Sequence, residues 1–376
     1  MSEKFAFLTA AEIRFGRGCA HDVAGAVRAL GGRIFLVTGA NVARAAWLES
    51  DLSPVGRFSA PYEPDLALIS AGVAAARAAG AEVIVALGGG AVIDTAKAIA
   101  ALVPTQRPIL DHLEVVGQGA ALDFAPLPFV AITTTAGTGA EVTKNAVIGV
   151  PEAQRKVSLR DDRMLANLAV VDPSLTDGTP RHITLASGLD AVTQVIEPYV
   201  CTRANRLTDA LCRDAIGVGL SALVGLMQQE TAQGRDDLAW VSLCGGLALA
   251  NSGLGAVHGL AGPIGGVIAA PHGAICGALL PHVLIANETR ATGQALARLQ
   301  ELRGVIGLAL GCEAAGAFGA LRDWSLSHGL PGLGAMGLAQ SHFAGVAEAA
   351  LVSSSMKANP NVLQRDDLIE ILKAAL

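Results

Sequence analysis

The 376-residue chain has few charged residues and no pair of cysteines spaced as CxxC. Charged residues make up 16% of the chain, no run of Lys and Arg occurs, and the net charge is −6, so we expect no nucleic-acid partner. The six Cys are scattered, and the first residues, MSEKF, lack the charged-then-apolar pattern of a secretory signal. These absences together predict a cytoplasmic protein with free thiols.

The chain also lacks an uninterrupted apolar run of membrane-spanning length. Its longest apolar tract extends from Ala256 to Ala286, but Pro263, Pro271 and Pro281 interrupt it and it contains three His. Since 52% of the residues are apolar, the chain has ample material for a buried core. We therefore expect buried helices in this tract and no membrane partner.

Strand signals are confined to the first half of the chain. Apolar, β-branched runs predict buried strands at residues 33–38, 83–87, 128–133 and 168–171, and residues 66–79 predict a helix that ends at Gly80. This alternation is typical of parallel strands joined by helices. After the turn-rich residues 172–180, helical patterns rich in Ala and Leu continue to the end. We predict an α/β domain with a parallel sheet over residues 1–178 and an all-helical domain over residues 179–376.

One predicted strand leads directly into three glycines. Gly88, Gly89 and Gly90 are followed by a helical pattern that contains Ala91 and Asp94. Backbone amides and the positive end of a helix meet at such a turn, which indicates a phosphate-binding site. The segment matches neither GxxxxGK[ST] nor GxGxxG, so glycines that serve only close packing remain the alternative.

A Thr-rich loop follows the next predicted strand. It covers residues 133–143 and includes Thr134, Thr135 and Thr138. Clustered hydroxyls and glycines at the end of a strand suit a diphosphate and a ribose, and a capped turn is the alternative interpretation.

The second half of the chain contains polar residues that suit a metal. His258 and His272 lie fourteen residues apart in apolar, Gly-rich surroundings, and upstream Asp190 and Gln194 are four residues apart, so that on a helix they share a face. Each His alone is more often a hydrogen-bonded core residue. Burying a carboxylate and two imidazoles without a common partner is costly, however, so the set favours a divalent-metal site.

Four segments carry a family resemblance: GGGAVIDTAK, TTAGTGAEVT, GLDAVTQVIEPY, and VHGLAGPIGG followed by PHG. They resemble the iron-containing (group III) alcohol dehydrogenases, which share the dehydroquinate synthase-like fold. The resemblance extends from residues 15–18 to residues 359–361 and keeps the order of the segments. It implies that the α/β domain binds a dinucleotide and that the helical domain binds metal and substrate.

The resemblance also implies which residues act. NAD(P) would be bound by Gly39, Gly88, Gly89, Gly90, Ala91, Asp94, Thr134, Thr135, Thr138 and Lys156. Asp190, His258 and His272 would be catalytic as ligands of a divalent metal, which the family suggests is Fe²⁺, with Zn²⁺ or Mn²⁺ as alternatives. Gln194 stands where the family normally has a fourth, His ligand, and its amide oxygen would be a weaker one. Gly262 stands where the family tends to carry a His assigned to proton relay.

The residue after the first strong strand bears on the choice of cofactor. Relatives that prefer NAD often have Asp where Gly39 stands, and without that carboxylate nothing repels a 2′-phosphate, which Arg44 could reach. NADP is therefore admissible. The alternative is that Gly39 serves only a turn.

The implied activity is metal-dependent, NAD(P)-linked oxidation of an alcohol or reduction of a small aldehyde or ketone, by a homodimer or larger homo-oligomer. Three alternatives stay open. A maleylacetate-reductase-like enzyme tends to have Asn in place of Asp190, and a lyase of the dehydroquinate synthase type would need more basic residues than Lys97, Lys144, Arg155 and Lys156. The third is a nucleotide-binding pseudoenzyme, in which Gln194 and Gly262 mark a decayed metal site. The sequence does not identify the substrate.

Overall fold

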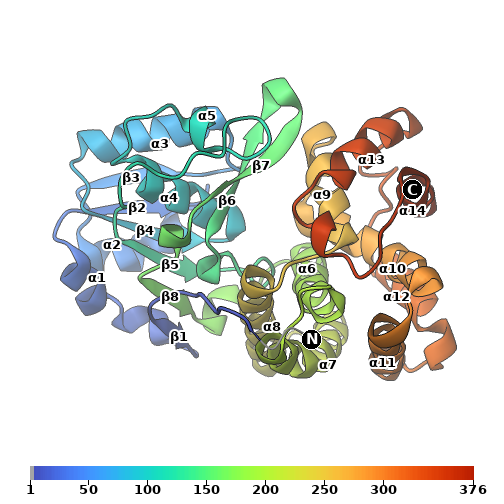
Figure 1. Cartoon of the computed structure of the whole chain (residues 1–376). Coiled ribbons are helices and arrows are strands. Elements are labelled where there is room, and N and C mark those ends of the chain that lie inside the picture. Colours follow the sequence, from blue (N-terminus) through green and yellow to red (C-terminus); the bar gives the residue numbers. More distant parts are fainter. Residues whose placement is uncertain (1–3) are drawn as a thin grey trace. The chain divides into compact units, whose positions relative to one another are not determined.

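The computed structural model describes residues 4–376, and its internal contacts divide the chain into two compact units (Figure 1). The α/β unit comprises Leu8–Thr135 and Gly139–Asp177. The helical unit comprises Gly178–Leu376 together with residues 4–7 and Ala136–Thr138. The Thr-rich loop therefore contributes residues to both units.

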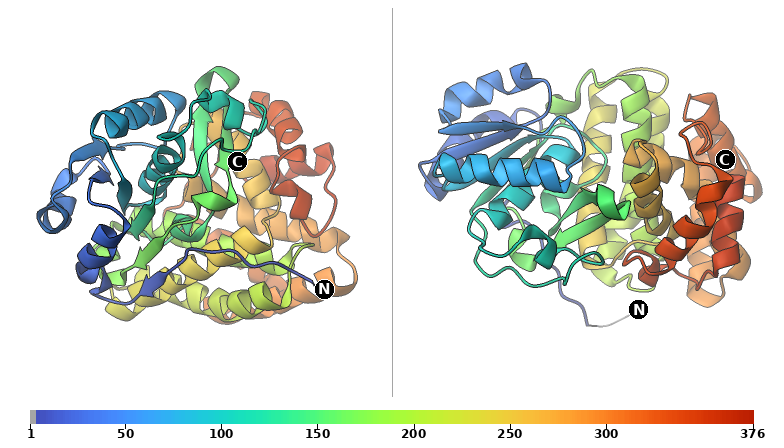
Figure 2. Two further views of the ribbon diagram at one scale, coloured as in Figure 1. Left: turned by 60° about the vertical axis from the view of Figure 1, so that its left-hand side comes forward. Right: turned by 90° about the horizontal axis from the view of Figure 1, so that it is seen from above.

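A six-stranded parallel sheet with strand order β1-β8-β5-β4-β2-β3 forms the centre of the α/β unit. Figure 2 shows this unit, coloured blue to green, from two further sides. The strands are β1 (Ile13–Phe15), β2 (Ile34–Thr38), β3 (Gly56–Ser59), β4 (Val83–Gly88), β5 (Phe129–Thr133) and β8 (Leu168–Val171). Every residue of β2, β4, β5 and β8 is buried, because helices cover both faces of a parallel sheet. The predicted parallel α/β fold is confirmed.

The strands absent from the prediction are those without a continuous apolar run. β1 and β3 are partly exposed, and β6 (Asn145–Val150) and β7 (Arg155–Arg160) form an antiparallel hairpin in which buried and more exposed residues alternate. A half-exposed strand needs fewer apolar residues, so its sequence signal is weaker.

Helices of the α/β unit connect the strands. They are α1 (Ala24–Leu30), α2 (Ala46–Leu52), α3 (Leu66–Ala78), α4 (Gly90–Leu102) and α5 (Ile109–His112), with 3₁₀ segments at η1 (Cys19–Asp22), η2 (Val42–Ala45), η3 (Ala140–Val142), η4 (Pro151–Ala153), η5 (Asp162–Met164) and η6 (Pro173–Thr176). The Asp65 carboxylate caps α3 by accepting from the Leu68 amide at 2.7 Å. Gly80 follows this helix with a left-handed φ of 60°, as a C-terminal glycine commonly does.

The order of the strands reverses between β2 and β4. From β2 the chain continues to β3 on one side, and from β4 it continues to β5 on the other. In such sheets ligands bind beyond the carboxyl ends of the strands at the point of reversal. Thr38 of β2 pairs with Leu87 of β4, and Gly88 pairs with Thr133 of β5, so the loops that begin at Gly39, Gly89 and Thr134 leave the same edge of the sheet side by side.

No strand occurs after Val171 in the part of the chain that the structure describes. The helical unit contains α6 (Arg181–Val200), α7 (Arg206–Leu226), α8 (Ala232–Asn251), α9 (Ala256–Val267), α10 (His272–Arg290), α11 (Gly293–Leu310), α12 (Ala317–Ser327), α13 (Phe343–Leu351) and α14 (Arg365–Ala374), with 3₁₀ segments at η7 (Ala314–Gly316), η8 (Gln340–His342) and η9 (Met356–Ala358).

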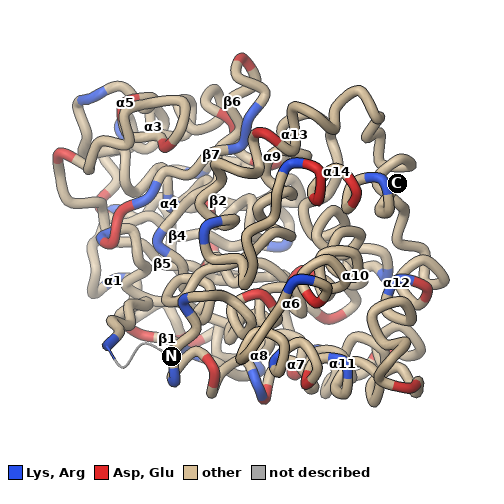
Figure 3. Tube along the Cα trace, turned by 45° about the vertical axis from the view of Figure 1, so that its right-hand side comes forward, with Lys and Arg blue, Asp and Glu red and all other residues tan. Residues whose placement is uncertain are grey.

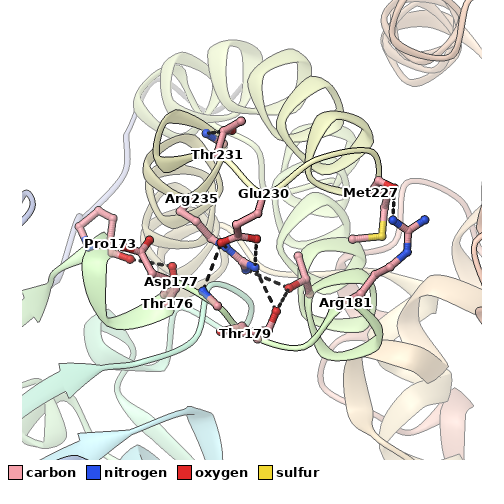
Figure 4. A network of polar contacts seen from close by, with 12 residues as sticks. Pro173, Thr176, Asp177, Thr179, Arg181, Met227, Glu230, Thr231 and Arg235 are labelled. Carbon is pink, nitrogen blue, oxygen red and sulfur yellow. Dashed lines mark hydrogen bonds and ion pairs between the residues drawn. The ribbon is translucent and has the colours of Figure 1, made fainter.

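A buried arginine ties the beginnings of α6 and α8 together (Figure 4). The Arg235 guanidinium donates to Thr184 Oγ1 at 2.9 Å and to the Thr179 carbonyl at 3.1 Å, and it forms an ion pair with Glu230 at 2.6 Å. Arg181 donates to the Met227 carbonyl next to this network. A buried guanidinium with all these partners keeps α6, which carries Asp190, fixed against α8.

Among residues 4–376, no single helix is long and apolar enough to cross a membrane, whereas two bent pairs, Ala232–Asn251 with Ala256–Val267 and Gly293–Leu310 with Ala314–Ser327, meet the length and composition criteria together. Acidic and basic residues are interspersed along the chain in both units (Figure 3).

Candidate metal centre and cofactor site

Four side chains of the helical unit converge on one point. Asp190 comes from α6, His258 from α9, and His272 and Cys276 from α10, and one ligand atom of each lies within 4.8 Å of the others. Asp190 Oδ1 is 3.5 Å from His258 Nε2 and 4.0 Å from His272 Nε2. The predicted carboxylate and both predicted imidazoles are thus brought together, and a thiol joins them.

Two glycines allow α10 to approach α6 closely enough to bring His272 and Cys276 next to Asp190. A Cβ at Gly273 would lie 2.4 Å from the Ala186 carbonyl oxygen and 3.1 Å from Asp190 Cβ, and a Cβ at Gly277 would lie 2.7 Å from Leu189 Cδ1. Any larger residue at Gly273 would push the helices apart. The glycine directly after His272 therefore sets the distance between that imidazole and Asp190.

Glu197 orients His258. Its Oε2 is 2.6 Å from His258 Nδ1, and its Oε1 accepts from the Val257 amide at 2.7 Å, where α9 begins. A carboxylate on Nδ1 favours the proton there and leaves Nε2 as the acceptor that points to Asp190. Glu197 therefore has two roles. It accepts a hydrogen bond from the Val257 amide, which has no partner within α9, and it favours the His258 tautomer whose Nε2 can bind a metal.

Neither Glu197 nor Cys276 was among the predicted site residues, although their spacing is a usable signal. Glu197 follows Asp190 by seven residues on α6, and Cys276 follows His272 by four on α10, so each shares a helix face with a predicted ligand. Cys276 has no paired-cysteine signature, because its partners in the cluster are a carboxylate and two imidazoles.

Gln194 lies one turn after Asp190 and is 3% exposed. Its side-chain nitrogen donates to the Gly137 carbonyl at 2.8 Å, within the helical unit. Gly262 lies one turn after His258 on α9, and a Cβ there would meet no atom within 4 Å. The missing relay imidazole has therefore not been replaced by another packed side chain at that point.

The cluster fits a cation. Asp190 is 2% exposed, and its Oδ1 is buried without a hydrogen-bond partner. Burial alone would raise the pKa of Asp190, but His272 and His258 outweigh burial and hold that pKa below its usual range. The neighbouring Cys276 sulfur and, after it, the Asp190 carboxylate raise the pKa of His272 to about 9. A site with this negative potential and an orphaned oxygen is suited to a divalent metal.

The glycine turn of the α/β unit lies between β4 and α4. Gly89 precedes the first residue of α4 without any side-chain cap, and a Cβ on it would lie 3.0 Å from Thr135 Cγ2 and Oγ1. The Thr134 amide donates to the Gly88 carbonyl at 3.0 Å, so the turn and the Thr-rich loop are adjacent. A Cβ at Gly88 would lie 2.5 Å from Val92 Cβ, so close packing alone requires that glycine.

The other predicted cofactor residues have protein partners. Asp94 Oδ2 accepts from the Val147 amide at 3.0 Å, and Lys156 forms an ion pair with Glu63. The Ala91 carbonyl accepts from Thr95 Oγ1 at 2.7 Å, and Gly90 is the first residue of α4. Thr138 groups with the helical unit rather than with Thr134 and Thr135.

The loop after β2 is open to substitution. At Gly39 a Cβ would meet only Val92 Cγ2, at an ordinary 3.6 Å, and the Gly39 carbonyl accepts from Ser59 Oγ at 3.3 Å. The Arg44 guanidinium donates to the Leu175 carbonyl at 2.9 Å. The structure therefore leaves room for a Cβ at position 39.

A parallel α/β unit with a glycine turn at its strand reversal is typical of enzymes that bind a dinucleotide, and the carboxylate–imidazole–thiol cluster of the helical unit is suited to a metal ion. Residues 10–173 match the sequence profile of "Iron-containing alcohol dehydrogenase", and residues 184–376 match "Fe-containing alcohol dehydrogenase family, C-terminal". The chain belongs to the iron-containing alcohol dehydrogenase family, which confirms the predicted resemblance.

Characterised relatives agree with the predicted oxidoreductase class. The chain is 34% identical over 301 residues to the NAD-dependent methanol dehydrogenase of Bacillus methanolicus, covering 78% of this chain and 77% of that one. It is 31% identical over 318 residues to the lactaldehyde reductase of Escherichia coli, covering 83% and 81%. Alcohol dehydrogenase 4 of Saccharomyces cerevisiae is 37% identical over 240 residues, a match that spans 64% of this chain and 62% of the yeast enzyme.

Solved structures show the same fold. A 1,3-propanediol oxidoreductase superposes with a TM-score of 0.87 at 28% identity, over 100% of both chains. A maleylacetate reductase from Agrobacterium tumefaciens superposes with a TM-score of 0.78 at 24% identity, over 100% of this chain and 98% of that one, which shows a shared fold alone.

Proposed function

We propose that this protein is a metal-dependent, NAD(P)-linked alcohol dehydrogenase that oxidises a small alcohol and reduces the corresponding aldehyde or ketone. The observation that carries the proposal is the cluster of Asp190, His258 and His272 around an orphaned, buried carboxylate oxygen. The named substrates of the relatives, methanol, lactaldehyde and 1,3-propanediol, are all small alcohols or aldehydes, which supports a small substrate here.

The residues have distinct roles in this proposal. Asp190, His258 and His272 would hold a divalent metal, Fe²⁺ by family or Zn²⁺, and Glu197 keeps His258 in the ligating tautomer. When bound, the metal supplies Lewis acidity toward the substrate oxygen and the dinucleotide supplies the hydride. Because Gly262 carries no imidazole, the substrate proton would leave through water or a ribose hydroxyl.

The cofactor would bind at the strand reversal. The amides around Gly88, Gly89 and Gly90 and the N-terminus of α4 would face the diphosphate, with the hydroxyls of Thr134 and Thr135 beside it. Lys156 and Asp94 would have to exchange or share their present partners to reach it. With Gly39 after β2, NADPH would be accepted about as well as NADH.

The proposal also includes the cellular compartment and the oligomeric state of the protein. All six cysteines are unpaired in the structure, which supports a reducing, cytoplasmic compartment, and we propose a homodimer or larger homo-oligomer, since closed homo-oligomers are common among soluble enzymes. Nothing favours the maleylacetate-reductase alternative beyond the fold, and Asp190 in the cluster counts against it.

Metal reconstitution combined with a substrate panel tests the proposal. The purified chain would be loaded anaerobically with Fe²⁺, Zn²⁺ or Mn²⁺, analysed for metal stoichiometry, and assayed on small alcohols, aldehydes and ketones with both cofactors. Metal retention with turnover is the expected result. A chain that retains no metal and is not stimulated by any of the three ions would contradict it and favour the pseudoenzyme alternative.

A substitution tests the cofactor site separately. In Gly89→Val the new side chain would press on Thr135 and cover the turn, so binding of NAD(P)H measured by fluorescence titration should be abolished while the fold persists. Gly25→Val is the control, because a Cβ at Gly25 meets nothing within 4 Å. Unchanged NAD(P)H binding in Gly89→Val would contradict the assignment.

A further inference from the structure

The position of Cys276 in the cluster carries an inference about the fourth ligand. We propose that Cys276 Sγ, rather than Gln194, is the fourth protein ligand of the metal, which makes the centre a carboxylate, two-imidazole, thiolate site that prefers Zn²⁺. This inference rests on the proposed metal-dependent function and specifies the donor set of the same centre.

The distances match a coordination sphere. Cys276 Sγ is 3.6 Å from His272 Nε2, and Asp190 Oδ1 is 3.5 Å and 4.0 Å from the two imidazole nitrogens. A tetrahedral Zn²⁺ with ligands at about 2.0–2.3 Å separates its ligand atoms by roughly 3.3–3.8 Å. The three distances lie in or near this range, and the other pairs of ligand atoms lie within 4.8 Å of one another.

Cys276 lies close to all the other members of the cluster. Its Sγ is within hydrogen-bonding distance of His272 Nε2, and it lies within 4.8 Å of a ligand atom of Asp190 and of His258. Its place on α10, one turn after His272, comes from the same helix face that Gly273 and Gly277 bring against α6. Cys276 shares this cluster with Asp190, whose Oδ1 is buried and has no hydrogen-bond partner.

Gln194 is held elsewhere. Its side-chain nitrogen donates to the Gly137 carbonyl at 2.8 Å, which fixes the plane of the amide by a contact outside the cluster. A Cβ at Gly245 would lie 3.0 Å from Gln194 Cβ, so α8 limits how far the side chain can turn. An amide oxygen is moreover a weaker ligand for Zn²⁺ than the thiolate that Cys276 would provide.

The thiolate changes the choice of metal. On metal binding Cys276 loses its proton to solvent, and the sulfur forms the bond to the ion. Sulfur is a softer donor than an amide oxygen or imidazole and favours Zn²⁺ over Mn²⁺, while Fe²⁺ stands below Zn²⁺ in the general order of affinities. Zinc accepts a fifth ligand during catalysis, so four protein ligands do not by themselves close the site.

X-ray absorption spectroscopy of the zinc-loaded protein tests the proposal directly. Wild-type protein should show one sulfur scatterer at about 2.3 Å beside lighter atoms at about 2.0–2.2 Å. Cys276→Ser should lose the sulfur scatterer and bind Zn²⁺ at least ~10-fold more weakly in a chelator competition, since loss of even an outer partner of a metal site has that effect. Gln194→Ala should keep the sulfur scatterer.

Two further measurements test whether Cys276 is a ligand of the metal. Cobalt-loaded wild type, but not Cys276→Ser, should show a near-ultraviolet sulfur-to-cobalt charge-transfer band, and bound zinc should protect Cys276 from alkylation mapped by mass spectrometry. Cys244→Ser is the matched control, because Cys244 is buried in α8 outside the cluster and burial raises the pKa of its thiol to about 12.

The outcomes separate the two proposals. Stoichiometric zinc without a sulfur scatterer, or with affinity unchanged in Cys276→Ser and reduced in Gln194→Ala, would overturn the assignment of Cys276 and leave the metal-dependent function standing. A wild type that binds none of the metals would overturn both. Circular dichroism of each variant shows that it is folded before its metal is measured.

Discussion

Each unit buries a charged side chain, and the two side chains differ in their hydrogen-bond partners. Lys97 of α4 is 1% exposed, and its ammonium donates to the carbonyls of Ala140, Thr143 and Asn145 and to Thr143 Oγ1, at 2.7–2.9 Å. Asp190 of α6 is 2% exposed, yet its Oδ1 has no hydrogen-bond partner. The first charge is hydrogen-bonded to acceptors of its own unit, whereas the second keeps one buried oxygen without a hydrogen-bond partner.

This difference separates a structural charge from a functional one. A buried ion surrounded by fixed donors or acceptors stabilises one local conformation. A buried ion left incomplete is costly to the fold and is expected where a ligand completes it. The comparison thus predicts opposite consequences for removing the two side chains.

Asp190→Ala should have the largest functional effect. Loss of the anionic ligand should remove metal and turnover together, whereas the free energy of unfolding of the metal-free protein should change by no more than about 2 kcal/mol, because the carboxylate that is removed has a buried oxygen without a hydrogen-bond partner. Metal stoichiometry and urea denaturation measure the two quantities. A variant that keeps stoichiometric metal would contradict the functional reading of Asp190.

Lys97→Met should instead mainly lower the free energy of unfolding. Burial lowers the pKa of Lys97 to about 8, so the side chain is still mostly protonated at neutral pH, and its removal leaves several buried acceptors unpaired. We expect a loss of about 3 to 5 kcal/mol of unfolding free energy in urea denaturation. Lys144→Met, which breaks the partly exposed ion pair with Asp162, should cost about 1 kcal/mol or less. Equal losses in both variants would remove the structural role assigned to Lys97.

Glu141 adds a pH dependence to the α/β unit. Burial raises the pKa of Glu141 from 4.5 to about 7, so the folded state binds this proton more tightly than the unfolded chain. The stabilisation is complete below pH 4.5 and is lost as the pH rises to about 7. Relative to Glu141→Gln, wild type should therefore lose on the order of 2 kcal/mol across that range. Urea denaturation at several pH values measures this, with the exposed Glu152→Gln as control; a difference independent of pH would contradict it.

Gly39→Asp should have the smallest effect. It adds a charge after β2 and should change only the preference between NADH and NADPH. The new carboxylate fits beside Val92 and would repel a 2′-phosphate, shifting preference toward NADH by on the order of 1 to 3 kcal/mol. Ratios of kcat/KM for the two cofactors measure the shift. Ala40→Asp places the same charge one residue further along and serves as control. A wild-type enzyme that strictly rejects NADPH would contradict the role given to Gly39.

The elements found from sequence are those with dense local signals. β2, β4, β5 and β8 are continuous apolar runs because both faces of the strands are buried, and α3 ends at a glycine with left-handed φ. The half-exposed strands β1, β3, β6 and β7 escaped prediction because exposure on one side dilutes the apolar pattern. Short, partly exposed strands depend on their neighbours for stability rather than on their own composition.

For the candidate metal centre, the residue types and their helix faces follow from the sequence alone: Asp190 and Gln194 lie one turn apart on α6, and two imidazoles lie in an apolar region. Which of these side chains meet depends on how the helices pack. Gly273 lets α10 approach α6, Glu197 turns His258, Gly137 engages the Gln194 amide, and Cys276 enters the cluster. Spacing along a helix specifies a face, but the partner of that face depends on how the helices pack, and packing is set by contacts between residues far apart in the chain.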